Sequence, residues 1–378
     1  MFFQEKTDTM VSDFFFSIVN PVENPDEIIL ETIPFLITLF SYGIATFCCF
    51  LFLQPTYYRI VRKLKIQQEI REHTSDGRIA EIFRAFHLKK SGTPTGGGVL
   101  IWGSVLIVIL LSRFFSLVGF LDKSLLQRGE VYLPLFSLIV MGIFGGIDDF
   151  WNARKIGKKR GIDVTPKMIF LIFFALLGSL WFYFRLGYTE ITIPGMGVFD
   201  IGWLAIPLYI LVIVATANAV NITDGLDGLA GGLLITAFAT FGALAFFREH
   251  FFLAIFCGLI VSALFAFLWF NVPPAKFFMG DTGSLALGAC LGVIAMMIDA
   301  VAILPIVGII FVLEALSVII QVISKRLRNG KKVFRSAPVH HHFEAIGWTE
   351  PQIVMRFWII GGAFAGIGLI IGLVGLTT

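Results

Sequence analysis

Residues 251–270 read FFLAIFCGLIVSALFAFLWF, twenty consecutive residues without a charge. At 1.5 Å of rise per residue, a helix of this length is about 30 Å long, which matches the hydrocarbon core of a bilayer. Only helices and closed barrels satisfy their backbone polar groups in lipid, and so long a continuous apolar run is typical of a helix. The stretch therefore predicts a transmembrane helix.

Nine more apolar runs lie on either side of this one. They are 33–53, 98–118, 131–147, 168–184, 203–220, 229–247, 284–299, 301–323 and 353–375. Of the 378 residues, 57% are hydrophobic and 15% charged, against about 45–50% and about 25% in soluble domains. These numbers exclude soluble, disordered and fibrous proteins. We predict an all-α integral membrane protein with ten transmembrane helices, formed as a single polytopic domain over 31–378. An N-terminal extension, 1–30, precedes it, for which two interpretations are open, a short periplasmic helix or a disordered segment.

The basic residues predict the orientation of these helices. Most of the 29 Lys and Arg residues lie in three loops, 54–97, 148–167 and 324–352. Cytoplasmic loops carry the positive excess in membrane proteins. Ten spans with both termini on the outer side place all three loops on the cytoplasmic face. The net charge of +3 gives no bulk positive field, so we expect no nucleic-acid partner. The four cysteines lie inside apolar runs and predict neither a disulfide framework nor a zinc site.

Acidic residues gather at the same face, at the ends of the predicted helices. They are Asp148, Asp149, Asp224, Asp227 and Asp281. Carboxylate and Asn oxygens suit Mg²⁺, and the basic residues around them suit phosphates. Together they are the groups that phosphoryl transfer needs. A cleft at the boundary of membrane and cytosol suggests one lipid substrate and one water-soluble substrate.

Structural interpretations compete with this functional one. Two acids at a helix C-terminus, as in Asp148-Asp149, oppose the helix dipole unless a cation or the basic loop that follows neutralises them. Asp281 precedes Thr-Gly-Ser and, taken alone, is better explained as a helix cap. Four polar residues recur at every third position, which exceeds what one cap needs. They are Asn218, Asn221, Asp224 and Asp227.

Three further segments also have two interpretations each. The glycine-rich stretch 92–98 could hold a phosphate at a helix N-terminus or could serve close helix packing. The triplet His340–His342 cannot present three rings to one metal on a regular helix, which leaves an exposed loop or contacts with phosphate. Glu314 lies in the middle of a predicted span, where an acid is either functional or paired inside the bundle.

Five segments resemble the motifs of a known family and occur in the family's order. They are TPTGGG (93–98), DD (148–149), NAVNITDGLDGLA (218–230), FMGDTGSL (278–285) and PVHHHFE (338–344). From about residue 33 onward the chain resembles the polyprenyl-phosphate N-acetylhexosamine-1-phosphate transferases, of the glycosyltransferase 4 type. The histidine triplet, with Gly347-Trp348 after it, is most similar to the branch that acts on muramoyl-pentapeptide donors.

The resemblance implies an activity, a cofactor and a location. The enzyme would transfer phospho-MurNAc-pentapeptide from UDP-MurNAc-pentapeptide to undecaprenyl phosphate, giving lipid I and UMP. It would need Mg²⁺ and form a homodimer in the bacterial cytoplasmic membrane, surrounded by membrane lipid, with its cleft on the cytoplasmic face. The implied catalytic residues are Asp148, Asp149 and Asp281, of which Asp281 and Asp149 would bind the metal.

The resemblance also implies a set of substrate-binding residues. They are Lys90, Thr95, Asn218, Asn221, Asp224, Asp227, Asn271, Phe278, Gln321, His340, His341 and His342. Phe278 would stack on the uracil. The chain departs from the family pattern at Gly96, where Met is usual, and at Asn152, where Lys is frequent. Which lysine of 152–160 meets phosphate is therefore left open.

Alternatives remain at the level of chemistry and of function. The lipid phosphate could attack the donor directly, or an Asp could form a covalent intermediate. A transferase that uses UDP-N-acetylglucosamine would share the carboxylates, although the histidine segment argues against it. An ion-coupled transporter would place its binding residues near the midplane of the membrane, whereas these acids cluster at one face.

Overall fold

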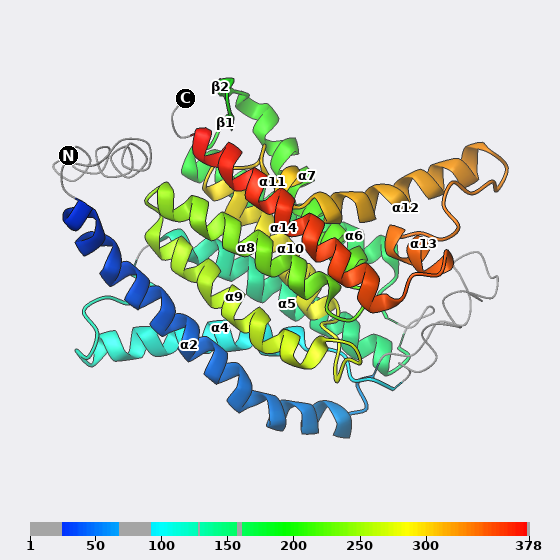
Figure 1. Cartoon of the computed structure of the whole chain (residues 1–378), viewed down its shortest axis with the longest axis horizontal. Coiled ribbons are helices and arrows are strands. Elements are labelled where there is room, and N and C mark those ends of the chain that lie inside the picture. The colour runs from blue at the N-terminus through cyan, green and yellow to red at the C-terminus, as the bar shows by residue number, and fades with distance from the viewer. Residues whose placement is uncertain (1–24, 68–91, 128, 157–160, 376–378) are drawn as a thin grey trace.

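The computed structural model describes residues 25–67, 92–127, 129–156 and 161–375, which form a bundle of helices (Figure 1). The long helices are α2 (Pro25–Lys63), α4 (Gly98–Leu117), α5 (Tyr132–Ala153), α6 (Val164–Leu180), α7 (Ala205–Thr223), α8 (Leu229–Phe247), α9 (Phe251–Asn271), α10 (Asp281–Met297), α12 (Ile309–Leu327) and α14 (Glu350–Val374). Short elements are η2 (Gly129–Val131), η3 (Trp181–Arg185), β1 (Glu190–Ile193), β2 (Gly197–Asp200), η4 (Gly202–Leu204), α11 (Leu304–Val307) and α13 (Val339–Ala345).

Each of the ten predicted apolar segments falls on a helix, which confirms the helical class. Within the described residues, eight helices are long and apolar enough to cross a membrane, and α10, with 17 residues, is a shorter apolar helix. The segment 301–323 is not one continuous helix as predicted, because the chain breaks at Gly308 between α11 and α12. The second piece carries Glu314, Lys325 and Arg326, so it is less apolar than a simple span.

The N-terminal boundary also differs from the prediction. Helix α2 begins at Pro25, so the last residues of the predicted extension, 1–30, belong to this helix. Residues 1–24 lie outside the described part of the chain.

Helix α10 lies at the centre of the bundle and is buried from Thr282 to Met296. Glycines let the neighbouring helices approach its backbone closely. A Cβ added at Gly98 of α4 would lie 2.2 Å from the Cα of Gly283, and one added at Gly145 of α5 would lie 2.2 Å from the carbonyl oxygen of Asp281. On the other side, a Cβ at Gly288 would lie 2.7 Å from a carbonyl oxygen of α7. Three helices are thereby held against α10.

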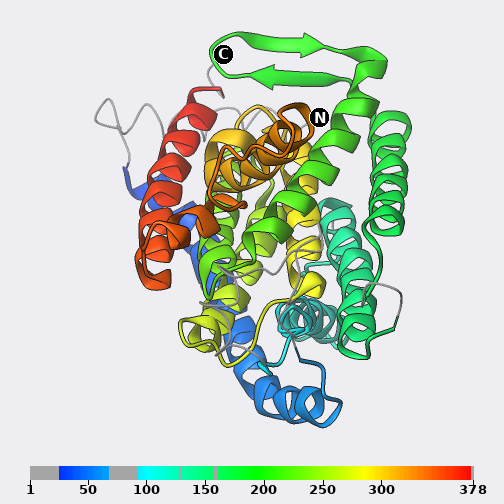
Figure 2. The same ribbon diagram turned by 90° about the vertical axis from the view of Figure 1, so that its right-hand side faces the viewer.

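The end of the bundle beyond the C-terminus of α10 is covered by a small antiparallel hairpin, β1–β2, which lies across it in Figure 2. The sequence analysis treated this region as a loop and did not predict strands. Asp299, in the turn after α10, accepts a hydrogen bond from the backbone N–H of Thr192 at 3.0 Å. Arg248 donates to the carbonyl oxygen of Ile298 at 2.5 Å. The first bond ties the hairpin to the turn after α10. The second ties that turn to the end of α8.

The close approach of α4 to α10 predicts different outcomes for two glycines of the same helix. We expect Gly98→Ala to lower the midpoint of thermal unfolding of the detergent-solubilised protein, because its Cβ meets backbone atoms that cannot move away. Gly103→Ala is the matched control, since a Cβ there meets nothing within 4 Å and alanine is the better helix former. Equal midpoints for the two variants would contradict this account of the packing.

Candidate active site

The N-terminus of α10 is held by the carboxylate of Asp149, at the end of α5. Its Oδ1 accepts a hydrogen bond from the backbone N–H of Asp281, and its Oδ2 accepts one from Thr282, each at 3.1 Å. A carboxylate at a helix N-terminus satisfies free N–H groups and faces the positive end of the dipole. Asp149 is 8% exposed. Asp149 lies near the C-terminal end of α5, where the dipole of that helix disfavours a negative charge. The N–H groups at the start of α10 offset this effect.

Asp148 and Asp281 are joined by Lys167, which lies in the first turn of α6. The Nζ of Lys167 donates to Asp148 at 2.6 Å and also to Asp281. The other oxygen of Asp148 accepts the backbone N–H of Ile162 at 2.5 Å. A half-buried ammonium between the buried carboxylate of Asp148 and the half-buried carboxylate of Asp281 offsets part of the unfavourable removal of these charges from water. The cation that the Asp148-Asp149 pair requires is thus supplied, within the described residues, by a lysine that the sequence analysis did not single out.

Asn221 of α7 completes this group. Its Nδ2 donates to Oδ1 of Asp281 and to the hydroxyl of Ser284, each at 2.8 Å. We call Asp148, Asp149, Lys167, Asn221 and Asp281 the carboxylate cluster. Its members come from α5, α6, α7 and α10, so four helix ends meet here.

Asn218 lies one turn before Asn221 but is not part of this cluster in the described contacts. Its Nδ2 donates to the carbonyl oxygen of Val214, in its own helix. Helix α7 then ends at Thr223, before Gly225 and Gly228, two residues that weaken a helix. The regular repeat from Asn218 to Asp227 therefore does not form one helical face.

Asp224 caps the C-terminus of α7 and is half-buried. Burial raises its pKa well above the ordinary value, and the nearby charge of Asp281 raises it further. Two acids that face each other in a protein interior cannot both ionise without penalty. A bound cation would relieve this penalty, so Asp224 suits a site that receives positive charge.

A second group joins the loops that follow α7 and α9. The buried carboxylate of Asp227 accepts the backbone N–H of Ala275 at 3.0 Å. The backbone N–H of Asp227 in turn donates to Oε1 of Glu350 at 2.7 Å. The side chain of Asn271 accepts from Gly228 at 2.9 Å and donates to the carbonyl oxygen of Phe277 at 3.0 Å. Asn271 therefore holds two loops together, and Glu350 is a further polar member that the sequence analysis did not identify.

The glycine-rich segment packs against the chain that precedes α10. The N–H groups of Gly97 and Gly98 donate to the carbonyl oxygens of Phe278 and Met279, at 2.8 and 2.9 Å. Phe278, which is half-buried, donates its own N–H to Pro94 at 2.9 Å. Of the two interpretations of 92–98, the described contacts favour close packing. The segment carries Thr95 to the edge of the carboxylate cluster, where a Cβ at Gly280 would lie 2.7 Å from its Oγ1 and 2.4 Å from Asp149.

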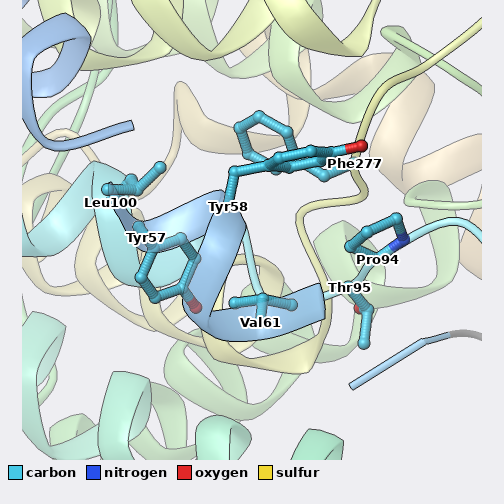
Figure 3. Close-up of a pocket in the computed structure, with 7 residues that line it drawn as sticks. All are labelled: Tyr57, Tyr58, Val61, Pro94, Thr95, Leu100 and Phe277. Carbon is cyan, nitrogen blue, oxygen red and sulfur yellow. The ribbon is translucent and has the colours of Figure 1, made fainter. Parts of the chain in front are cut away.

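Beside Thr95 lies a small pocket between the end of α2 and the start of α4 (Figure 3). Its lining is mostly apolar. It consists of Tyr57, Tyr58, Val61, Pro94, Thr95, Leu100 and Phe277. Its volume of about 10 Å³ has room for roughly one water molecule. The pocket is too small for a nucleotide or a lipid, and we regard it as a packing feature, where Tyr57 donates to the carbonyl oxygen of Gly96 at 2.7 Å.

The histidine triplet lies on the short helix α13, and its three rings have different partners. Nδ1 of His340 lies 2.9 Å from Glu314, and Nδ1 of His341 lies 2.6 Å from Glu344. Nδ1 of His342 accepts the backbone N–H of Arg335 at 3.1 Å. Each ring is therefore oriented by the protein itself. Glu314 is paired inside the bundle, which was one of its two interpretations.

Gln321 of α12 holds the chain that leads to this triplet. Its Oε1 accepts the N–H groups of Val333 and Phe334, and its Nε2 donates to the carbonyl oxygen of Phe334. Lys90, another predicted binding residue, lies outside the described residues, as do residues 157–160 of the basic loop.

The donor set of the carboxylate cluster is suited to Mg²⁺. This cation keeps several waters and is usually bound by one or two carboxylates together with substrate phosphates. Asp281 and Asp149 lie side by side and provide such carboxylates, with an amide from Asn221 beside them. No group of three or more His, Cys, Asp or Glu side chains with metal-binding geometry occurs among the described residues. The arrangement thus fits a magnesium ion shared with substrate, and not a closed structural metal site.

The part of the chain that contains this site is similar in sequence to known proteins. Residues 131–299 match the family described as glycosyl transferase family 4, a range that contains the whole carboxylate cluster. The chain is 40% identical over 328 residues to the phospho-N-acetylmuramoyl-pentapeptide-transferase of Bacillus thuringiensis (strain Al Hakam), which covers 85% of this chain and 93% of that protein. Proteins of the same name from Bacillus cereus strains AH187 and G9842 show the same identity and coverage.

The raised pKa of Asp224 predicts that this residue lowers the stability of the protein. A carboxyl group whose pKa is raised by folding destabilises the folded state once it ionises, at a pH above its unfolded pKa of about 4. We expect Asp224→Asn to raise the midpoint of thermal unfolding at neutral pH in magnesium-free buffer. The difference from the unmodified protein should shrink as the pH falls toward about 4.

The matched control for this measurement is Asp122→Asn, because Asp122 is exposed in the loop after α4. Its midpoint should follow that of the unmodified protein at every pH. A midpoint for Asp224→Asn at or below that of the unmodified protein at neutral pH would contradict the account.

Proposed function

Since this chain belongs to the phospho-N-acetylmuramoyl-pentapeptide-transferase family, we propose that it transfers phospho-MurNAc-pentapeptide from its UDP carrier to undecaprenyl phosphate. The products are lipid I and UMP, and the reaction is a membrane step of peptidoglycan synthesis. The chain is a bacterial, membrane-embedded transferase. One observation carries the proposal: Asp281 of α10 meets the neighbouring Asp148 and Asp149 of α5, which lie far away in the sequence. Lys167 bridges Asp148 and Asp281, and Asp149 accepts the backbone N–H of Asp281.

The chemistry follows from the charges at this cluster. An oxygen of the lipid phosphate attacks the β-phosphorus of the donor, the bond to the bridging oxygen breaks, and UMP leaves with that oxygen. A phosphate monoester has a second pKa near about 6, so the attacking group is largely ionised at neutral pH. A strong general base is therefore not required, and positioning and charge neutralisation dominate catalysis.

Lys167 is suited to neutralise phosphate charge. An ammonium group has three donors, of which two are directed to Asp148 and Asp281. The two carboxylates fix its position, and its third donor has no hydrogen-bond acceptor among the described residues, so it can meet a phosphate oxygen. A preorganised positive group of this kind stabilises the charge that develops in the transition state. The carboxylates thus act first by holding a cation where phosphates react.

The proposal includes Mg²⁺ as cofactor, bound by Asp281 and Asp149 together with the diphosphate. When bound, it would neutralise the diphosphate and assist departure of UMP. Support comes from the donor set and from the family resemblance. Asn221 orients Asp281 through a hydrogen bond at 2.8 Å, and Asp149 fixes the backbone of Asp281 at 3.1 Å.

The proposal also includes the placement of the enzyme in its membrane. Ten spans with both termini outside would put the carboxylate cluster on the cytoplasmic face of the inner membrane, where the soluble donor is found. The positive loops 54–97, 148–167 and 324–352 support this orientation. A homodimer is part of the proposal on the strength of the family resemblance alone.

The proposal predicts a donor preference. We expect the purified protein, with undecaprenyl phosphate and Mg²⁺, to release UMP from UDP-MurNAc-pentapeptide. Release from UDP-N-acetylglucosamine should be absent, and chelation of the metal or Asp281→Asn should abolish the reaction. Release from UDP-N-acetylglucosamine would assign the protein to another branch of the family. No release from either donor by folded protein would refute a transferase function and favour transport.

The bridging position of Lys167 predicts a large effect on catalysis. We expect Lys167→Met to lower kcat/KM by about 10²-fold or more, the usual effect of removing a preorganised electrostatic group. The variant should also unfold at a lower temperature, because two buried carboxylates lose their counter-ion. Lys123→Ala is the control, since Lys123 is exposed in the loop after α4. Unchanged kcat/KM in Lys167→Met would remove this lysine from the mechanism.

A further inference from the structure

Between Glu314 and Ser324, helix α12 has its polar residues inside and large apolar residues outside. The buried positions Glu314, Ser317, Gln321 and Ser324 follow one another at helical spacing, and we call them the α12 polar stripe. Large apolar side chains such as Ile319, Ile323 and Leu327 are exposed on the other side. The helix extends beyond the rest of the bundle in Figure 1. An apolar exterior suits lipid, so the polar stripe must find its partners within the protein.

The partners of the α12 polar stripe lie in the chain that runs back toward α13. The hydroxyl of Ser324 donates to the carbonyl oxygen of Lys331 at 2.9 Å. Three hydrogen bonds join Gln321 to Val333 and Phe334. At the far end, Glu314 meets His340. The stripe is therefore a row of attachments for residues 331–340, and Glu314 makes the last and most deeply buried of them.

The pair of Glu314 and His340 is closed to solvent. The two side chains are 0% and 1% exposed, with Oε2 of Glu314 2.9 Å from Nδ1 of His340. Within the described residues, the second atom of each group, Oε1 of Glu314 and Nε2 of His340, has no hydrogen-bond partner. Burial of a carboxylate is unfavourable unless it is paired. A hydrophobic residue would fill this position at less cost, so the acid serves the histidine.

The other side of the His340 ring touches the loop that carries Asp224 and Asp227. A Cβ added at Gly225 would lie 2.4 Å from Nε2 of His340 and 2.8 Å from its Cε1. The ring therefore fills the space beside a residue without a side chain. Any change in the orientation of the imidazole changes what Gly225 packs against. Glu314 is thus connected through one ring to the acids between α7 and α8.

We propose that Glu314 is a positioning residue that acts through His340 on the loop of residues 224–228. Glu314 does not meet the substrates itself. It fixes the His340 ring, the ring fixes Gly225, and Gly225 sets the positions of the acids on either side of it. The inference rests on the proposed function and on the family resemblance, which implies that Asp224 and Asp227 bind the UDP-linked donor. The resemblance implies that Asp148 and Asp149 lie near the phosphate of the lipid acceptor, so binding of the acceptor should not depend on the pair of Glu314 and His340.

The test is steady-state kinetics of the full-length protein in detergent, with the KM of donor and acceptor measured separately. We expect Glu314→Leu to raise the KM for the UDP-linked donor by about 10- to 100-fold, the effect of a small misplacement in a binding site. The KM for undecaprenyl phosphate should be unchanged. Glu314→Gln, which can still accept a hydrogen bond from Nδ1 of His340, should restore most of the donor affinity. Ser317→Ala is the matched control, because Ser317 lies on the same buried face and, in the part of the chain that the structure describes, its hydroxyl donates only to the carbonyl oxygen of Glu314.

A second variant approaches the pair from the other side. Gly225→Ala places a methyl group against the His340 ring and should raise the donor KM as Glu314→Leu does. The double variant Glu314→Leu with His340→Ala should have a donor KM no higher than that of the more affected single variant. The effects of two residues that act in series are not additive. Gly225→Ala remains informative even where Glu314→Leu folds poorly, because it leaves Glu314 unchanged.

The outcomes separate the two proposals. Absence of transfer by the unmodified protein refutes the proposed function. An active unmodified protein with unchanged donor KM in Glu314→Leu and in Gly225→Ala refutes the positioning role. Equal increases in the two KM values, or additive effects in the double variant, also refute it, because they indicate a general structural disturbance.

Discussion

The hydrogen bonds between Asp149 and the first two N–H groups of α10 are the contact on which the site depends. Helix α10 is enclosed by α4, α5 and α7, whose glycines bring backbone against backbone. Its N-terminus can therefore occupy one position only, and Asp149 occupies the space directly before it. The backbone of Asp281, the first residue of α10, is thereby fixed, and its carboxylate starts from a fixed position. Lys167 and Asn221 need only reach a point that the packing has already set.

The sequence predicted the transmembrane helices, because lipid requires them, and the acidic residues at the ends of these helices, because lipid disfavours them. Runs of twenty apolar residues predict helices, and the acids at their ends predict a polar cluster. It did not predict Lys167, because a lysine in a basic loop looks like its neighbours until the fold brings it beside Asp281, 114 residues away. The hairpin was also missed, since its strands have only four residues each. The break at Gly308 was missed because apolar residues continue on both sides of it.

Sequence identifies polar residues but does not show which partner uses their hydrogen bonds. Asn271 and Gln321 were both predicted to bind substrate, yet their described hydrogen bonds go to backbone groups of neighbouring loops. Gly97 and Gly98 were candidates for phosphate binding, and their N–H groups meet carbonyl oxygens before α10. A polar residue in a membrane protein must be satisfied somewhere, and in a crowded bundle the nearest partner is usually the chain itself. Its identity alone therefore cannot separate a binding residue from one that holds a loop.

The acids of this protein differ in how well the fold satisfies them, and that difference separates their roles. Asp149 has two backbone N–H groups, and Asp148 has a backbone N–H and Lys167. Glu314 has a histidine and no access to solvent. Asp224 is half-buried, with its pKa raised by burial and by the charge of Asp281. A fold selected for stability alone would not keep an acid in that position. The first three acids therefore have hydrogen-bond partners that the fold itself supplies, whereas Asp224 has a raised pKa that a bound cation would lower.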